Sequence, residues 1–244
     1  MLKRLETNST KLSEDTFSNK FTGKKVLVMG SGNSINEVNW ENLEYDCIAT
    51  TTHFYLNDKI RNLKNITHVT LSEIIDFQHP DLLNFLDKNP ECTLALEPVK
   101  GRPFYSSDIW KNFELKYRDR LVYYQTETSK IEGAAGRLTY FVMAFNPSDL
   151  YYVGIDGHAK DRKDSPFNAF RPDKKDHDDG LHSYEKFFES HMNMAKVLYE
   201  YSKLNKTKLY NLGEGLFYNC STPYSKENFP LNNKIKDKIK KWKT

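Results

Sequence analysis

The residues best placed to do chemistry are two glycines that follow a short apolar segment. Residues 26–29 read Val-Leu-Val-Met, and Gly30-Ser31-Gly32-Asn33-Ser34 comes next. The apolar run predicts a strand buried on both faces, and the glycines permit a tight turn that brings backbone close to a ligand. Ser34 would cap a helix over residues 35–43, with Glu37 completing a capping box. This arrangement predicts a site for a nucleotide phosphate, although a two-glycine motif is equally typical of a plain tight turn.

Two other polar segments also follow predicted strands. Thr52 and His53 come after a strand expected over residues 45–51, and Gly154-Ile155-Asp156 closes a strand expected over residues 150–155. The carboxyl ends of parallel strands meet at one edge of a sheet, where ligands bind, so we expect these residues near the glycine turn. Asp156 could accept ribose hydroxyls or bind a metal through phosphate, or it could simply form a turn. His158, two residues on, could donate to a phosphate or act as an acid, or be an exposed loop histidine.

His182 is the sharpest candidate for proton transfer. It ends a polar cluster, residues 176–182, whose consecutive side chains favour a solvated loop over a metal site. It also precedes Ser183, the expected cap of a long helix over residues 183–204. A helix N-terminus keeps an imidazole neutral, which suits a general base that deprotonates a hydroxyl. His191 falls on the apolar face of the same helix and is more typical of a core histidine.

Strands alternate with helices along the chain. Further strands are expected over residues 66–71, 93–96, 121–125 and 207–212, and helices over residues 72–86, 107–117 and 138–145. Ser72 would cap the first of these helices, with a break or kink at His79-Pro80. This order predicts the α/β class: one Rossmann-like domain with a mostly parallel sheet and helices on both faces. The stretch 126–136 is polar and glycine-bearing, and its Gly136 is a candidate nucleotide-binding residue.

The domain is expected to span residues 24–222. Residues 1–23 are polar and predict a flexible lead-in. Residues 159–180 are expected to form a long charged loop, typical of a lid, a binding loop or disorder, which carries Lys160 and Arg162.

Composition narrows the function classes. The chain has 244 residues, 38% apolar and 14% aromatic, and its net charge of +3 does not suggest nucleic-acid binding. Its three cysteines, Cys47, Cys92 and Cys220, are too scattered for a disulfide framework or a zinc site, so a reducing compartment fits best. Neither a membrane-spanning apolar run nor a signal-peptide pattern is visible. We therefore expect a cytoplasmic protein; the oligomeric state stays open, and a homo-oligomer is compatible with the sequence.

The last segment, residues 223–244, differs from the rest. Leu231, Ile235, Ile239 and Trp242 make one apolar stripe at helical spacing. The stripe is surrounded by six lysines: Lys234, Lys236, Lys238, Lys240, Lys241 and Lys243. A basic amphipathic helix of this kind predicts peripheral contact with the inner face of a membrane. A terminal helix docked on the body, with a solvated lysine face, fits the same pattern.

Several of these motifs together resemble a known family. Residues 26–34 resemble the opening glycine motif of the bacterial sialyltransferases that act on lipooligosaccharide, the Campylobacter type. Residues 53–59, His-Phe-Tyr-Leu-Asn-Asp-Lys, are similar to the next block, and residues 151–156 look like the family's Gly-Ile-Asp strand end. His182-Ser183, a long helix and residues 208–212 follow in the family's order. The resemblance is scattered over roughly residues 24–218.

The resemblance implies a Rossmann-like sheet, a CMP-activated sugar donor, a glycan acceptor, no obligatory metal and an inverting transfer. It assigns His182 to the acceptor hydroxyl, and the nucleotide to the Gly30–Ser34 turn and to Gly154, Ile155 and Asp156. The sequence departs from the family at several positions. The family's asparagines fall at Ser31 and Thr52, and its Thr-Ser-Gly stretch is replaced around residues 133–136. A tyrosine that assists the leaving phosphate falls at His158, and Lys160 or Arg162 would stand in for a second one.

Three functions therefore stay open. The leading hypothesis is a sialyltransferase-like glycosyltransferase of cell-surface glycan biosynthesis, with no cofactor. The second is a pyrophosphokinase similar to the archaeal MptE-like group, which shares the opening and Gly-Ile-Asp motifs and would need ATP and Mg²⁺. The third is a nucleotide-binding module without chemistry.

Overall fold

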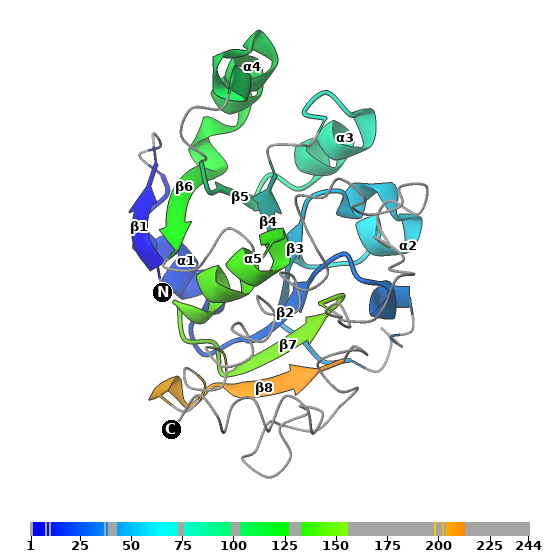
Figure 1. Ribbon diagram of the computed structural model, residues 1–244, viewed down its shortest axis with the longest axis vertical. Coiled ribbons are helices and arrows are strands. Elements are labelled where there is room, and N and C mark those ends of the chain that lie inside the picture. The colour runs from blue at the N-terminus through cyan, green and yellow to red at the C-terminus, as the bar shows by residue number, and fades with distance from the viewer. Residues whose placement is uncertain are drawn as a thin grey trace, which may run out of the picture.

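A twisted sheet forms the centre of the computed structural model. The structure describes residues 2–7, 9, 11–36, 38, 43–72, 76–98, 103–126, 133–155, 198, 202 and 204–212. Within them, eight strands form one sheet in the order β1-β6-β5-β4-β3-β2-β7-β8. All neighbouring strands are parallel except β1, which pairs antiparallel with β6. Figure 1 shows β8 beside β7 at one margin and β1 beside β6 at the other.

The strands are β1 (Leu2–Glu6), β2 (Lys25–Met29), β3 (Cys47–Thr51), β4 (Ile66–Leu71), β5 (Thr93–Leu96), β6 (Leu121–Thr126), β7 (Asp149–Val153) and β8 (Lys208–Asn211). The helices are α1 (Glu14–Phe21), α2 (Asp58–Arg61), α3 (Pro80–Lys88), α4 (Asp108–Tyr117) and α5 (Gly133–Met143). Short 3-10 turns are η1 (Asn33–Asn36), η3 (Phe54–Leu56), η4 (Pro103–Ser106) and η5 (Arg118–Arg120). The predicted strands over 66–71 and 93–96 are confirmed at both ends.

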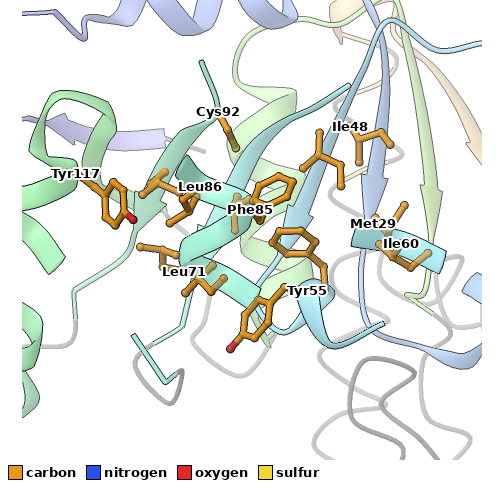
Figure 2. Packing of buried hydrophobic residues seen from close by; sticks show 14 of the residues in the cluster. Met29, Ile48, Tyr55, Ile60, Leu71, Phe85, Leu86, Cys92 and Tyr117 are labelled. Atoms are coloured by element: carbon orange, nitrogen blue, oxygen red, sulfur yellow. The ribbon is translucent and has the colours of Figure 1, made fainter. Parts of the chain in front are cut away.

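The strands are apolar on both faces because helices cover both. Alternate residues of β2 enter different cores: Val26 and Val28 pack with α1 and α5, whereas Leu27 and Met29 pack with α2, α3 and α4. Figure 2 shows part of the second core, where Met29 and Ile48 of the sheet face Ile60, Phe85 and Leu86 of the helices. The predicted α/β fold, a mostly parallel sheet with helices on both faces, is confirmed.

The prediction that residues 1–23 are a flexible lead-in is wrong. This segment contains β1, which extends the sheet, and α1, whose Phe17 and Phe21 are fully buried. The two rings lie 5.2 and 6.4 Å from the ring of Phe141 on α5. Two aromatic residues four positions apart form one helical stripe, which is enough to dock an otherwise polar helix.

Three other local predictions are wrong at their boundaries. Ser34 is not the cap of a helix that starts at residue 35; it lies inside η1, where the N–H of Ile35 donates to the carbonyl of Gly32 at 3.3 Å and the Ile35 side chain is buried. Helix α3 starts at Pro80 rather than at residue 72, because proline fits a first helical position and His79 Nδ1 accepts the N–H of Asp81. Helix α5 begins at Gly133 rather than at residue 138, so Gly136 lies within the helix.

His68 is a fully buried histidine whose environment excludes a charge. Its ring stacks on Phe141 at 4.9 Å and meets the edges of Phe17 and Phe21, while Nδ1 lies 2.9 Å from Oγ1 of Thr93. Burial, with the nearby Lys20 ammonium as a second cause, holds the pKa of His68 well below 6.5. The folded protein therefore keeps this imidazole neutral when the unfolded chain takes up a proton.

We expect this difference to make stability fall with acidity. Below the unfolded pKa of about 6.5 the unfolded state binds one more proton, so between pH 7.5 and 5.5 His68 should lower the free energy of unfolding by about 1.4 kcal/mol. Urea unfolding of the wild type and of His68→Leu at both pH values measures this term. Thr93 keeps its hydrogen bond to the carbonyl of Thr67 in the variant. Equal pH dependence in the two proteins would contradict the prediction.

Candidate functional site

The sheet reverses its direction of growth beside β2. The chain moves from β2 outward through β3, β4, β5 and β6, and then returns to place β7 on the other side of β2. In open α/β sheets, ligands bind at such a switch point, beyond the carboxyl ends of the strands. The segments that leave β2 and β7 at this edge are the Gly30–Gly32 turn and Gly154.

Two glycines at this edge touch each other through their backbones. The N–H of Gly30 donates to the carbonyl of Val153 at 2.8 Å, and the N–H of Gly32 donates to the carbonyl of Gly154 at 2.7 Å. A Cβ on Gly30 would lie 2.4 Å from the oxygen of Gly154, and a Cβ on Gly154, where φ is +66°, would lie 2.6 Å from the oxygen of Gly30. Glycine is therefore required at both positions, and it leaves the edge lined by bare backbone.

The first turn of α5 lies against the same point. A Cβ on Gly30 would lie 3.1 Å from the Cβ of Ala135, so the small residues Gly-Ala-Ala-Gly at 133–136 let the helix approach β2 closely. Gly136 itself is buried. The first N–H groups of a helix have no partner within it and carry its positive dipole end. The glycine turn and the start of α5 thus meet at one place, where the N–H groups of Gly30 and Gly32 already donate to Val153 and Gly154.

The end of β3 adds polar side chains next to the glycine turn. Thr50 Oγ1 donates to the carbonyl of Met29 at 3.3 Å, which ties the two strand ends together. Thr52 and His53 follow, 4% and 9% exposed, and the N–H of Thr52 donates to the carbonyl of Thr70 on β4 at 3.1 Å. The ring of His53 lies 6.2 Å from that of Tyr55.

Arg137 of α5 forms an ion pair with Glu97 that was not predicted from the sequence. Arg137 Nε is 3.1 Å from Glu97 Oε2, and the two side chains are only 19% and 10% exposed. Burial raises the pKa of the neighbouring Tyr124, and Arg137 opposes that shift. The sequence feature that could have indicated Glu97 as a site residue is its position. It directly follows the strand at 93–96, just as Asp156 follows the strand predicted over residues 150–155. The pair fastens the start of α5 to the end of β5.

The structure brings together the predicted residues that it describes. Gly30, Gly32, Gly154 and the buried Ile155 meet at the switch point, with Ser31 half-buried in the turn and the backbone of Asn33 and Ser34 in η1. Thr52 and His53 are one strand away, and Gly136 lies at the start of α5. The other predicted site residues lie outside the described residues: Asp156, His158, Lys160, Arg162 and His182. Residues 213–244, with the lysine-rich stripe, lie outside them as well.

The described part of the chain contains neither a cluster of metal ligands nor a membrane-spanning helix. No three His, Cys, Asp or Glu side chains within it gather closely enough to hold a metal ion. None of its helices has the length and apolar character needed to cross a bilayer.

Comparison with solved structures identifies the fold. A variant of the sialyltransferase CST-II in complex with CMP matches 89% of this chain and 99% of its own, with a TM-score of 0.52 and 18% identity. Campylobacter jejuni CstII with cytidine-5'-monophosphate covers the same shares at a TM-score of 0.48 and 16% identity. An α-2,3-sialyltransferase from C. jejuni in apo form covers 95% of this chain and 86% of its own, at a TM-score of 0.47 and 15% identity. No family model and no curated protein matches the sequence. The resemblance noted in the motifs is thus confirmed at the level of architecture: this chain has the fold of the sialyltransferase CST-II.

Proposed function

We propose that this protein is a sialyltransferase-like glycosyltransferase, which moves a sugar from a CMP-linked donor to a hydroxyl of a glycan with inversion. The observation that carries the proposal is the glycine pair at the β2–β7 switch point, where bare backbone and the start of α5 converge. It is supported by the fold, which is shared with a CST-II variant solved in complex with CMP.

The proposed roles follow from position. Backbone amides of the Gly30–Ser34 turn other than those of Gly30 and Gly32, which already donate to Val153 and Gly154, take the donor phosphate. Gly154, Ile155 and Asp156 hold the nucleoside side. The bond between the anomeric carbon and the phosphate oxygen breaks, and its electron pair stays on that oxygen. The acceptor oxygen bonds to the anomeric carbon from the opposite face, and its proton passes to His182. His158, Lys160 and Arg162 would stabilise the departing phosphate.

No metal is needed in this scheme, because backbone amides and side-chain cations take the phosphate charge. We propose that the 159–180 loop excludes water, which would otherwise hydrolyse the activated sugar. We also propose that the enzyme is cytoplasmic and that its lysine-rich tail holds it against the inner face of a membrane. This location suits an enzyme whose acceptor is a cell-surface glycan.

A ligand screen tests the proposal. Thermal shift with CMP, CDP, UDP, GDP and ATP, each with Mg²⁺ or with EDTA, should give the largest shift for CMP in both buffers, since a ligand at 100 times its Kd adds about 2.7 kcal/mol of stability. Turnover of CMP-sialic acid in EDTA should follow. A preference for ATP that requires Mg²⁺ would indicate the pyrophosphokinase instead. Nucleotide binding without turnover of any activated sugar would indicate a binding module.

A further inference from the structure

One buried residue at the candidate site has a backbone conformation that side chains rarely adopt. Among the described residues, positive φ at a residue other than glycine occurs at His53, Asn65, Asn146 and Lys206, with φ of 76°, 66°, 51° and 58°. The last three are exposed and precede β4, β7 and β8, at the amino edge of the sheet. His53 is 9% exposed and follows β3 at the opposite edge, where the glycine turn lies.

Neighbouring contacts hold His53 in this conformation. The carbonyl of His53 accepts the N–H of Leu56 at 2.9 Å to close η3, and the ring of Tyr55 lies 6.2 Å from that of His53 and 5.0 Å from that of His79. Arg61 then ties this segment to α3 through Asp81 Oδ2 at 3.0 Å. A left-handed residue that its surroundings hold in place is typical of functional sites.

Capping of η3 does not use the imidazole. His53 is the N-cap residue of η3, yet its side chain makes no capping hydrogen bond there. Glycine or asparagine adopts positive φ at lower cost, as Asn65 and Asn146 illustrate. A strained histidine retained beside a phosphate site therefore points to a role for its ring.

We infer that the His53 imidazole donates a hydrogen bond to the phosphate of the donor as it departs, an inference that rests on the proposed function. When the bond to the anomeric carbon breaks, the electron pair stays on the phosphate oxygen, and the imidazole N–H hydrogen-bonds to that oxygen. No proton needs to be transferred in this step, and the acceptor proton still goes to His182. The bond strengthens as charge develops on the oxygen, so it favours the transition state over the bound donor.

Substitutions that tolerate positive φ separate the ring from the backbone. His53→Asn and His53→Gly remove the imidazole, whereas His53→Ala removes it and keeps the strain. We expect the glycine variant to melt about 3 °C above the alanine variant. All three should lose at least about 100-fold in kcat while the KM for CMP-sialic acid changes less than about three-fold, and the Kd for CMP, whose phosphate carries the developed charge, should rise.

Asn65→Ala is the matched control, because it places alanine at a similar φ of 66° at the amino edge. It should lower the melting temperature without changing kcat. A kcat within about three-fold of wild type in His53→Asn or His53→Gly would overturn the inference while leaving the proposed function intact. Equal melting temperatures for the alanine and glycine variants would show that position 53 is not strained, which would overturn the inference. A wild type that neither binds CMP nor turns over CMP-sialic acid would overturn the proposed function and, with it, this inference.

Discussion

Replacing Gly154 by alanine should lower the free energy of unfolding by about 3 kcal/mol or more and abolish nucleotide binding. The new methyl group would lie 2.6 Å from the carbonyl oxygen of Gly30 and 2.8 Å from its carbonyl carbon. Both neighbours are backbone atoms, which cannot rotate away as a flexible side chain can. Relief requires β2 and β7 to separate at their carboxyl ends, which breaks the hydrogen bonds of Gly30 and Gly32 to Val153 and Gly154.

Gly23→Ala is the matched control for this experiment. Gly23 has a φ of +69°, close to the +66° of Gly154, but nothing lies within 4 Å of its added Cβ. It should cost only the left-handed backbone strain, about 1 kcal/mol. Urea unfolding of both variants therefore separates strain from overlap at the switch point. If the two substitutions lower the free energy of unfolding equally, the close approach of Gly30 and Gly154 does not contribute to the effect of Gly154→Ala, and the prediction is wrong.

His182→Ala should reduce kcat about 1,000-fold with the KM for the donor little changed. The proposed base acts on the acceptor hydroxyl, and a hydroxyl is a poor nucleophile until its proton is removed. Because the proposed donor site is the glycine turn, the donor's affinity should survive the loss of the imidazole. Steady-state kinetics with varied CMP-sialic acid and a saturating acceptor measure both quantities.

His177→Ala controls for the loss of a histidine from the same polar cluster, since that residue is predicted to lie in a solvated loop. It should retain activity within about two-fold, as surface substitutions usually do. Full transferase activity in His182→Ala would exclude this histidine as the base, and an equal loss in both variants would indicate damage to the loop rather than to proton transfer.

The strands were predictable because burial on two faces leaves a strong local signal. Val26 to Met29 are all apolar, and so are most residues of β4 and β5. The N-terminal segment was not predictable in this way, since β1 is stabilised by pairing with β6 about 120 residues later, for example Leu5 with Tyr124. A long-range partner leaves no mark on the local pattern of a polar segment.

The site was predictable only in part. The positions of Gly30 and Gly154 after buried strands placed both at one edge of the sheet, and the structure agrees. Their direct contact depends on β2 and β7 being neighbours, and the sequence pattern does not encode strand order. The same holds for Arg137, whose partner Glu97 is 40 residues away and comes within 3.1 Å only because α5 crosses the sheet.

Strand β1 takes the place of β6 as the edge of the sheet, and its charged residues Lys3, Arg4 and Glu6 make it a poorer template for pairing with another chain. It covers the backbone of β6 from Tyr123 to Thr126, and an uncovered edge of this kind is a template for pairing with another chain. A shortened chain that starts at Lys24 would expose that edge and would remove the two phenylalanine rings that enclose His68. Trimming this polar-looking segment to improve crystals would thus promote edge-to-edge aggregation, and an affinity tag placed directly before Leu2 would crowd the same strand.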